Sequence, residues 1–304
     1  MKIFNKKNIE ISIAVALILV IGVLLNSRLS RYPISYTWLT SMVINSRNNQ
    51  NEVLDRINNS LFTYLFNSVG VLQESGSIMT STSPYWWVNS GGKLILEDGL
   101  GKTIQGELPT DDKWRKIYSR ANKEDTDNGY HPQNIFRLIT KGSWYNLSEQ
   151  AFFKVTSSNL SESSNRNESN GLLLFSRYID SDNLYYTGIR VDGHVVIKKK
   201  KNGVYYTLAE KRIIAGEYNR LTSPNLIPKE TWIGIKSEIR TTLDKKVEIN
   251  LYTDISNTGV WELALSALDD GVDSGGIIDA SGKAGIRTDF MDVLFNDYKV
   301  EELH

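Results

Sequence analysis

Two turn dipeptides, Asp192-Gly193 and Asn202-Gly203, are the feature that most restricts how this chain can fold. Both suit two-residue type I′ turns, because each central residue of such a turn needs a positive φ angle. They bracket residues 194–201, a segment of strand length, and strand-like segments lie on either side. We therefore expect a three-stranded antiparallel meander over residues 185–209.

Four consecutive lysines, residues 198–201, close the middle strand of this meander. Side chains alternate along a strand, so Lys198 and Lys200 face one side and Lys199 and Lys201 face the other. We expect Lys199 and Lys201 to lie close enough to the turn for their long side chains to reach water. The whole chain has 35 basic and 35 acidic residues, so it lacks the positive excess typical of nucleic-acid-binding proteins. We interpret the run as part of a strand, not as a sorting signal, and expect no nucleic-acid partner.

From about residue 69 onward, short runs of β-branched and aromatic residues alternate with Gly, Asn and Asp turns, and we expect no helix of any length there. Ten or more strands in one block favour an all-β fold, a two-sheet antiparallel jelly-roll sandwich. The candidate strands are residues 93–96, 134–140, 150–156, 171–178, 185–191, 194–200, 204–209, 231–240, 246–254 and 291–300.

The N-terminus carries an apolar run, residues 11–25, behind three lysines. At about 1.5 Å per residue the run is short for a bilayer core of roughly 30 Å, but flanking residues can extend it. We expect a retained membrane anchor over residues 1–27, a helical stalk over residues 28–67, and a sandwich over residues 68–304 outside the cytoplasm. The stalk prediction rests on apolar residues at helical spacing in residues 48–67. A cleaved signal peptide, with secretion of the domain, is the alternative.

The chain has no cysteine and three histidines, which excludes disulfides, thiol catalysis and cysteine-ligated metals. Two acidic loops, residues 180–183 and 269–273, are rich in the oxygen ligands that calcium prefers, but neither matches an EF-hand loop. We expect no cofactor, and calcium stays as the open alternative.

Strand alternation predicts which side chains leave the core. Residues expected to point inward are Tyr185, Thr187, Ile189, Val191, Val195, Ile197, Ile233, Ile235, Ile239, Val247, Ile249 and Leu251. Those expected to point outward are Tyr186, Gly188, Arg190, His194, Val196, Lys198, Lys200, Trp232, Lys236, Glu238, Arg240, Glu248, Asn250, Tyr252 and Asp254. If these strands share a sheet, its outer face combines aromatic rings with forked donors and acceptors, which is typical of sugar-binding surfaces. An ordinary solvated sheet would also show this pattern.

The stretch RYIDSDNLYYTGIRVDGHVVIKKKKNGVYY, with IPKETWIGIKSEI, VEINLYTDI and KAGIRTDFMDVLFNDYKV, resembles the concanavalin A-like lectin/glucanase superfamily. Within it, the chain is similar to laminin-G-like and 3-keto-disaccharide hydrolase-like jelly rolls. The resemblance covers about residues 70–304 and implies a jelly roll whose concave sheet binds saccharide. Members include lectins, carbohydrate-binding modules, hydrolases and lyases, so the fold does not choose among them.

Catalytic patterns of these enzymes are missing from the sequence. No E-x-D-x-x-E strand of the laminarinase type occurs. The alginate-lyase pattern fails as well, because Lys283 has no tyrosine two residues before it and His131-Pro-Gln133 has the reverse order. A hydrolase or lyase with a different catalytic set remains an alternative, and a protein–protein adhesion module is a third.

We expect a membrane-anchored, non-catalytic, lectin-like domain whose partners are a glycan and, through the N-terminal helix, the membrane. Arginine forks match carboxylates, so Arg137, Arg177, Arg190 and Lys198 would suit an acidic glycan. The candidate ligand-binding residues are Arg137, Arg177, Tyr186, Arg190, Lys198, Trp232, Lys236, Glu238 and Tyr252.

Overall fold

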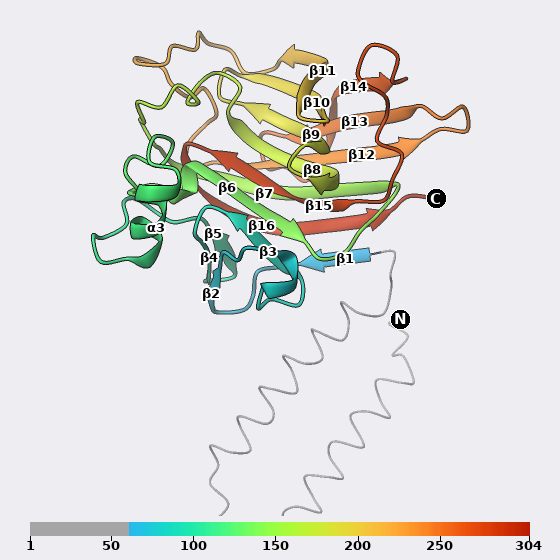
Figure 1. The fold of residues 1–304 in the computed structure, drawn as a ribbon. Helices are drawn as coiled ribbons and strands as arrows, with labels where there is room; N and C mark the ends of the chain where they lie inside the picture. The colour runs from blue at the N-terminus through green and yellow to red at the C-terminus, as the bar shows by residue number, and fades with distance from the viewer. Residues whose placement is uncertain (1–60) are drawn as a thin grey trace, which may run out of the picture. The chain divides into compact units, whose positions relative to one another are not determined.

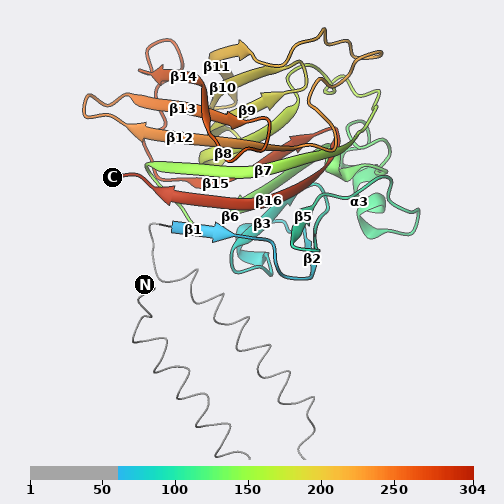
Figure 2. The ribbon, with the colours of Figure 1, turned by 180° about the vertical axis from the view of Figure 1, so that it is seen from behind.

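The computed structural model describes residues 61–304, which form two antiparallel sheets packed face to face (Figures 1 and 2). Sheet A has the order β14-β13-β12-β7-β16-β5-β4-β2, with β1 paired to β16, and sheet B has the order β11-β10-β9-β8-β15-β6-β3. The predicted two-sheet antiparallel sandwich is confirmed. The strands are β1 (Leu61–Tyr64), β2 (Gly70–Gln73), β3 (Trp86–Ser90), β4 (Lys93–Glu97), β5 (Leu100–Lys102), β6 (Ile135–Thr140), β7 (Leu147–Ser158), β8 (Gly171–Asp180), β9 (Asn183–Arg190), β10 (His194–Lys201), β11 (Val204–Arg212), β12 (Trp232–Thr241), β13 (Val247–Asp254), β14 (Glu262–Asp269), β15 (Lys283–Asp289) and β16 (Met291–Glu302).

Strand alternation fills the space between the sheets as predicted. In β12, Ile233, Ile235 and Ile239 are buried, whereas Trp232 and Lys236 are half-buried on the opposite side. Complete burial of one such side chain stabilises the fold by roughly 1.5–3 kcal/mol. The other inward residues predicted in β9, β10 and β13 are also buried. One residue predicted to point outward is nevertheless buried: Asp254 stands opposite Gly234 at the end of β13, and its carboxylate accepts hydrogen bonds from the N–H groups of Thr258 and Gly259.

A helix, α3 (Lys113–Ala121), interrupts the β pattern, so the expectation of no helix after residue 69 is wrong. It begins after Asp112, whose carboxylate accepts a hydrogen bond from the N–H of Trp114 at 2.7 Å. Trp114 and Tyr118, four residues apart, form its buried face. Only these two aromatic residues mark that face in a polar segment, which explains why the periodicity was too weak to indicate a helix. A 3₁₀ turn, η2 (Pro132–Asn134), precedes β6.

The two predicted turns have different geometries. Asn202 and Gly203 have φ angles of 51° and 81°, so the type I′ turn predicted between β10 and β11 is confirmed. At the β9–β10 connection only Gly193 has a positive φ, and its N–H donates to the Arg190 carbonyl. The connection is therefore a three-residue loop with glycine in the left-handed position, not a type I′ turn.

The lysine run has the alternation expected of a strand, but one of its members is fully buried. Lys199 is 0% exposed, and its Nζ donates to Asp269 Oδ2 at 2.7 Å, to the Ser274 hydroxyl and to the Gly276 carbonyl. The expectation that Lys199 reaches water is therefore wrong. Burial alone would raise the pKa of Asp269, but hydrogen bonds from Lys199, Tyr185 and Ser274 lower it below its ordinary value. The pair joins β10 of sheet B to β14 of sheet A.

Strand pairing begins before the predicted domain boundary at residue 68. β1 pairs with β16, so residues 61–64 form a strand and not the end of a helix. A compact unit comprises Asn58–His304. The predicted membrane segment and most of the predicted stalk lie outside the described residues. Within residues 61–304, no helix has the length and apolar character needed to cross a membrane.

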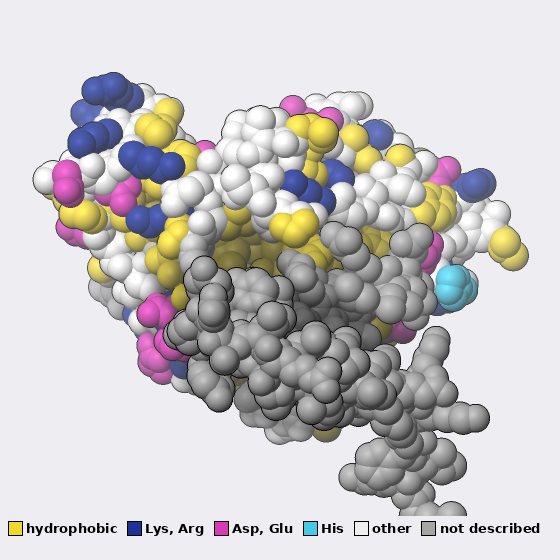
Figure 3. Space-filling view, turned by 90° about the horizontal axis from the view of Figure 1, so that it is seen from below, with side chains coloured by type: hydrophobic (Ala, Val, Ile, Leu, Met, Phe, Trp, Pro, Cys, Tyr) yellow, Lys and Arg dark blue, Asp and Glu magenta, His cyan; other side chains and the backbone are white. Residues whose placement is uncertain are grey.

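Several large apolar side chains are exposed on β1, β2 and the segments around them. They lie on the lower side of the domain in Figure 1, and Figure 3 shows hydrophobic side chains on that side. They are Leu61, Leu65, Val69, Val71 and Met79, of which Val69 is 84% and Met79 86% exposed.

Candidate functional site

The nine predicted ligand-binding residues do not lie on one surface. β9 and β10 belong to sheet B, whereas β12 and β13 belong to sheet A, so the assumption of one shared sheet is wrong. Tyr186, Arg190 and Lys198 lie on the outer face of sheet B, together with Arg137 of β6. Trp232, Lys236, Glu238 and Tyr252 lie on the outer face of sheet A. The two outer faces look away from each other, and each has its own chemistry.

Arg177 lies on neither outer face. Its guanidinium donates to the carbonyls of Tyr145 and Ile278 and to the side chains of Asn146 and Thr241, and the residue is 0% exposed. Its backbone has a φ of 48° where the pairing of β8 changes register, and this re-aims the side chain. Arg177 is thus a structural cross-link, and the side chain expected to bind a ligand is instead buried and hydrogen-bonded within the protein.

An apolar floor covers the outer face of sheet B, and we call this surface the Arg137 face. Phe175, Tyr186 and Val196 point away from the main core, yet they are 1%, 6% and 1% exposed because they pack in a second cluster. The half-buried Trp87 of β3 joins this cluster, and its indole N–H donates to the Ser75 carbonyl. Tyr186 is therefore part of a packed floor and not an open platform for a sugar ring.

Four cationic side chains stand on the Arg137 face, and two of them are neutralised by acids. Arg190 contacts Asp192 at 2.6 Å and Glu210 at 2.9 Å, and Arg287 contacts Asp289 at 2.8 Å. The paired acids hold these two guanidinium groups in place. The charge of Arg190 is therefore balanced by its two acidic partners, and its hydrogen-bonding capacity is largely used within the protein.

Arg137 and Lys198 have no such partner. Within residues 61–304 neither side chain makes a hydrogen bond or an ion pair. Arg137 stands directly opposite Arg287 in the pairing of β6 with β15, an arrangement in which like charges repel. Burial lowers the pKa of both Arg137 and Lys198, and nearby cationic charge, from Arg287 and from Arg190 respectively, lowers it further.

An unsatisfied acceptor lies next to Arg137. Asn89 occupies the bulge in the pairing of β3 with β6, where the register opposite Arg137 shifts. Its side-chain oxygen is buried and has no hydrogen-bond partner. A buried polar atom without a hydrogen-bond partner lowers the free energy of unfolding by about 1–3 kcal/mol. This region therefore has both hydrogen-bond donors, on Arg137, and an acceptor, on Asn89, that are not used within the part of the chain that the structure describes.

On the outer face of sheet A, a hollow of about 210 Å³ is lined by Phe152, Trp232, Asn257, Asn296 and Asp297. We call it the Trp232 hollow. Phe152 of β7 stands opposite both Gly234 of β12 and Asn296 of β16, so three neighbouring strands form its base. The pairing of β16 with β7 shifts register between Asn296 and Lys299, and this bulge forms one edge of the hollow. Asp297 lies in the bulge and has a φ of 47°.

An absent side chain makes room for the aromatic rings beside the hollow. A Cβ atom at Gly234 would lie 2.8 Å from the Trp261 ring and 3.0 Å from the Phe152 ring. Glycine here lets Trp261 lie against the sheet, with its ring centroid 5.5 Å from that of Phe152. On the other side, the Lys154 ammonium lies 5.2 Å from the centre of the Trp232 ring.

Lys236, Glu238 and Tyr252 form a self-contained polar group on sheet A. Lys236 Nζ lies 3.0 Å from Glu238 Oε1 and 4.1 Å from the centre of the Tyr252 ring. The Tyr252 hydroxyl donates to Glu238 Oε2 at 3.0 Å. Burial and then this hydrogen bond raise the pKa of Tyr252, so its hydroxyl stays protonated at neutral pH. The sequence correctly predicts that these side chains point outward. The charges of Lys236 and Glu238 neutralise each other.

The acidic loops considered for calcium are occupied by internal contacts. The Asp269 carboxylate accepts a hydrogen bond from Lys199 Nζ, and the Asp182 carboxylate forms an ion pair with Lys200 at 2.8 Å. No group of three or more His, Asp or Glu side chains that could hold a metal ion occurs within residues 61–304.

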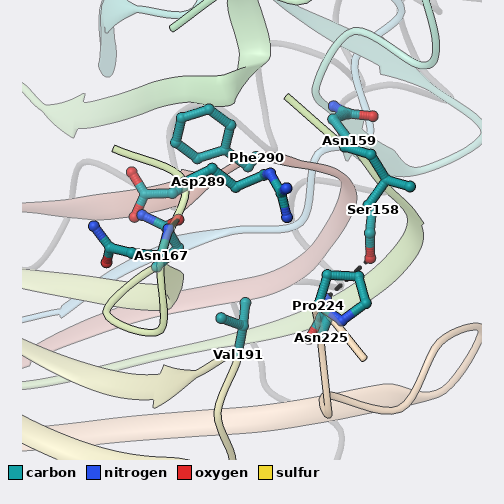
Figure 4. Close-up of a pocket in the computed structure, with 11 residues that line it drawn as sticks. Ser158, Asn159, Asn167, Val191, Pro224, Asn225, Asp289 and Phe290 are labelled. Carbon is teal, nitrogen blue, oxygen red and sulfur yellow. Dashed lines mark hydrogen bonds between the residues drawn. The ribbon is translucent and has the colours of Figure 1, made fainter. Parts of the chain in front are cut away.

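A second cavity, at the ends of β7, β9 and β15, is far smaller. Figure 4 shows it between Ser158, Asn159, Val191 and Phe290, with Asn225 donating to the Ser158 hydroxyl at 3.2 Å. Its volume is about 10 Å³, which is room for about one water molecule. The cavity is therefore too small for a sugar ring.

Several residues of these surfaces were missed by the sequence reasoning. Phe152 and Arg287 had a usable signal, since both fall at outward positions of alternating segments. Asn257, Asn296, Asp297 and Trp261 come from a turn, a bulge and the segment before β14, where alternation gives no orientation.

No protein-family model and no curated protein matches this chain. Among solved structures, the carbohydrate-binding module CBM66 from Bacillus subtilis is similar over 56% of this chain and 83% of its own, with a TM-score of 0.40 and 14% identity. A Bacillus subtilis protein of unknown function with a galectin-like fold matches 79% of this chain and 94% of its own, with a TM-score of 0.44 and 14% identity. A β-glucanase from Bacillus licheniformis matches 81% and 99%, with a TM-score of 0.42 and 10% identity. The likeness concerns the sandwich fold that the concanavalin A-like resemblance implies, and it says nothing about a ligand of this chain.

Proposed function

We propose that this protein is a membrane-anchored, extracytoplasmic glycan-binding domain that holds an acidic saccharide on the Arg137 face without cleaving it. The observation that carries the proposal is the pair of half-buried cations, Arg137 and Lys198, that have no partner within residues 61–304. Holding an unpaired charge in a partly desolvated place is unfavourable, and a ligand anion would remove that cost.

The spacing of the charges favours an extended ligand. Arg137 and Arg287 stand on β6 and β15, whereas Lys198 stands on β10, with β8 and β9 in between. At about 4.8 Å per strand, the two ends of this array are separated by roughly 19 Å. A small anion could reach only one end, but a saccharide chain with repeated carboxylate or sulfate groups could cross the strands and contact both.

The proposed binding is tested with the full-length chain in a detergent that has no sugar headgroup, on an array of acidic and neutral polysaccharides, with and without calcium. Arg137→Gln and Lys198→Gln should each weaken binding to acidic polymers at least about tenfold, because hydrogen bonds to charged groups contribute roughly 1.5–3 kcal/mol. Added salt should weaken binding as well. Arg240→Gln, an exposed arginine on sheet A, is the matched control and should leave the affinity unchanged.

Stability supplies an independent readout. Removing the charge of Arg137 relieves its repulsion with Arg287, so Arg137→Gln should unfold at an equal or higher urea concentration while it binds less well. A variant that lost both stability and binding would indicate a structural role and contradict the proposal. New reducing ends or unsaturated products during incubation would favour the hydrolase or lyase alternative instead.

A further inference from the structure

We propose that the Trp232 hollow is a second saccharide site, which takes one uncharged sugar ring on the side of the sandwich opposite the Arg137 face. Its volume of about 210 Å³ is below the roughly 300–1,000 Å³ of sites that enclose a drug-sized ligand, which suits a single ring. The two sites lie on different sheets, so one domain could hold two glycan chains at once.

The lining has the composition that a sugar ring requires. Phe152 and Trp232 offer flat apolar surfaces for the C–H face of the ring, and both are half-buried and held by their strands. Asn257, Asn296 and Asp297 stand at the rim with amide and carboxylate groups that can contact hydroxyls. The side-chain oxygen Oδ1 of Asn296 accepts a hydrogen bond from the N–H of Asp297 at 2.9 Å, so the side-chain NH₂ group of Asn296 is not used in this contact.

The charged groups in and beside the hollow indicate that its ligand is uncharged. The one charged group in the lining is the exposed carboxylate of Asp297, which disfavours an anionic ligand. A cationic ligand would compete with the ammonium of Lys154, which already lies 5.2 Å from the Trp232 ring. An uncharged polyhydroxylated ring avoids both conflicts and can use every group in the lining.

Two residues at the rim have an uncommon backbone conformation. Asn257 and Asp297 have φ angles of 51° and 47°, conformations that cost most residues about 1–2 kcal/mol and that Asn and Asp tolerate best. Both left-handed residues stand at the rim of the same hollow. Bulges of this kind often re-aim side chains at functional sites.

The experiment measures binding of the full-length chain to uncharged polysaccharides such as mannan, laminarin and inulin, with polygalacturonate as the acidic comparison. Trp232→Ala should reduce binding to the uncharged ligand at least about tenfold, because an aromatic anchor is lost. Asn257→Gly keeps the positive φ accessible and should weaken binding by roughly 2- to 10-fold. Binding of polygalacturonate should be unchanged in both variants.

Tyr205→Ala is the matched control, since Tyr205 is an exposed aromatic residue on β11 of the other sheet. Uncharged-ligand binding that survives Trp232→Ala, or an absence of any such binding by the wild-type chain, would overturn this second site and leave the Arg137 face untouched. Loss of polygalacturonate binding in Arg137→Gln with the uncharged ligand still bound would show that the sites are independent. If the Trp232→Ala variant does not fold, the Asn257→Gly variant is the test: unchanged binding of the uncharged ligand by that variant would overturn the second site.

Discussion

Glu149 shows how a single residue can be placed by contacts that the sequence does not reveal. It lies on β7 between the sheets, completely buried, and accepts hydrogen bonds from the N–H of Gly285 and the hydroxyl of Tyr298 at 2.8 and 2.6 Å. A register shift in the pairing of β15 with β8 occurs at Gly285, and Glu149 supplies the acceptor for the N–H there. Burial raises the pKa of Glu149 well above its ordinary value of 4.5.

This pKa shift predicts a pH dependence of stability. The folded-state pKa is raised, so the stabilising contribution is fully present below about pH 4.5 and is lost as pH rises through the folded pKa. In that window, the free energy of unfolding should fall by up to about 1.4 kcal/mol per pH unit. Glu149→Gln should remove this slope in urea titrations across pH, whereas Glu301→Gln, at an exposed position, should keep it. An unchanged slope in Glu149→Gln would contradict the assignment.

The two glycine turns of the meander show how tertiary contacts distinguish elements that look alike in the sequence. Gly193 and Gly203 have nearly equal φ angles, 83° and 81°, and both close hairpins of the same meander. The surroundings differ: a Cβ at Gly193 would lie 2.5 Å from the Ile214 carbonyl oxygen, whereas at Gly203 the nearest atom is 3.7 Å away. The segment after β11 folds back on the first hairpin but not on the second.

Alanine at these two glycines should therefore have unequal effects. Gly203→Ala should cost about 1–2 kcal/mol of unfolding free energy, which is the penalty for a Cβ in the left-handed region. Gly193→Ala should cost more, because the backbone of Ile214 must also move. Urea denaturation of both variants measures the difference. Equal losses would mean that the loop after β11 yields without cost.

At the scale of the whole molecule, the exposed apolar side chains around β1 and β2 lie next to the start of the described chain. Single exposed apolar residues are ordinary, but these side chains all come from residues 61–80, the first part of the described chain. Their exposure is expected of a domain that is held close to an apolar phase. It supports the proposed anchoring by residues 11–25, which lie outside the described residues.

Anchoring predicts a simple fractionation result. The full-length chain should sediment with membranes and resist carbonate extraction, and a variant that lacks residues 1–27 should be released, because it has lost the apolar run of residues 11–25 that the anchor needs. Protease added to intact cells should cut the domain if it faces outward. A mature N-terminus near residue 27, found by mass spectrometry in a released protein, would establish signal cleavage instead.

The sequence by itself determined ten of the sixteen strands of the described residues and, within four of them, which side chains leave the core. Ten of the strands, the inward positions of β9, β10, β12 and β13, and the Asn202-Gly203 turn follow from alternation and turn chemistry, which are local properties. It could not determine which strands share a sheet, because pairing depends on crossovers between segments far apart in the chain. The tertiary structure alone therefore separated Trp232 from Arg137, buried Lys199 against Asp269 and turned Arg177 inward. Alternation along a strand gives the side of its own sheet on which a side chain lies. Only the pairing of strands and the packing of the two sheets determine which residues that side chain contacts.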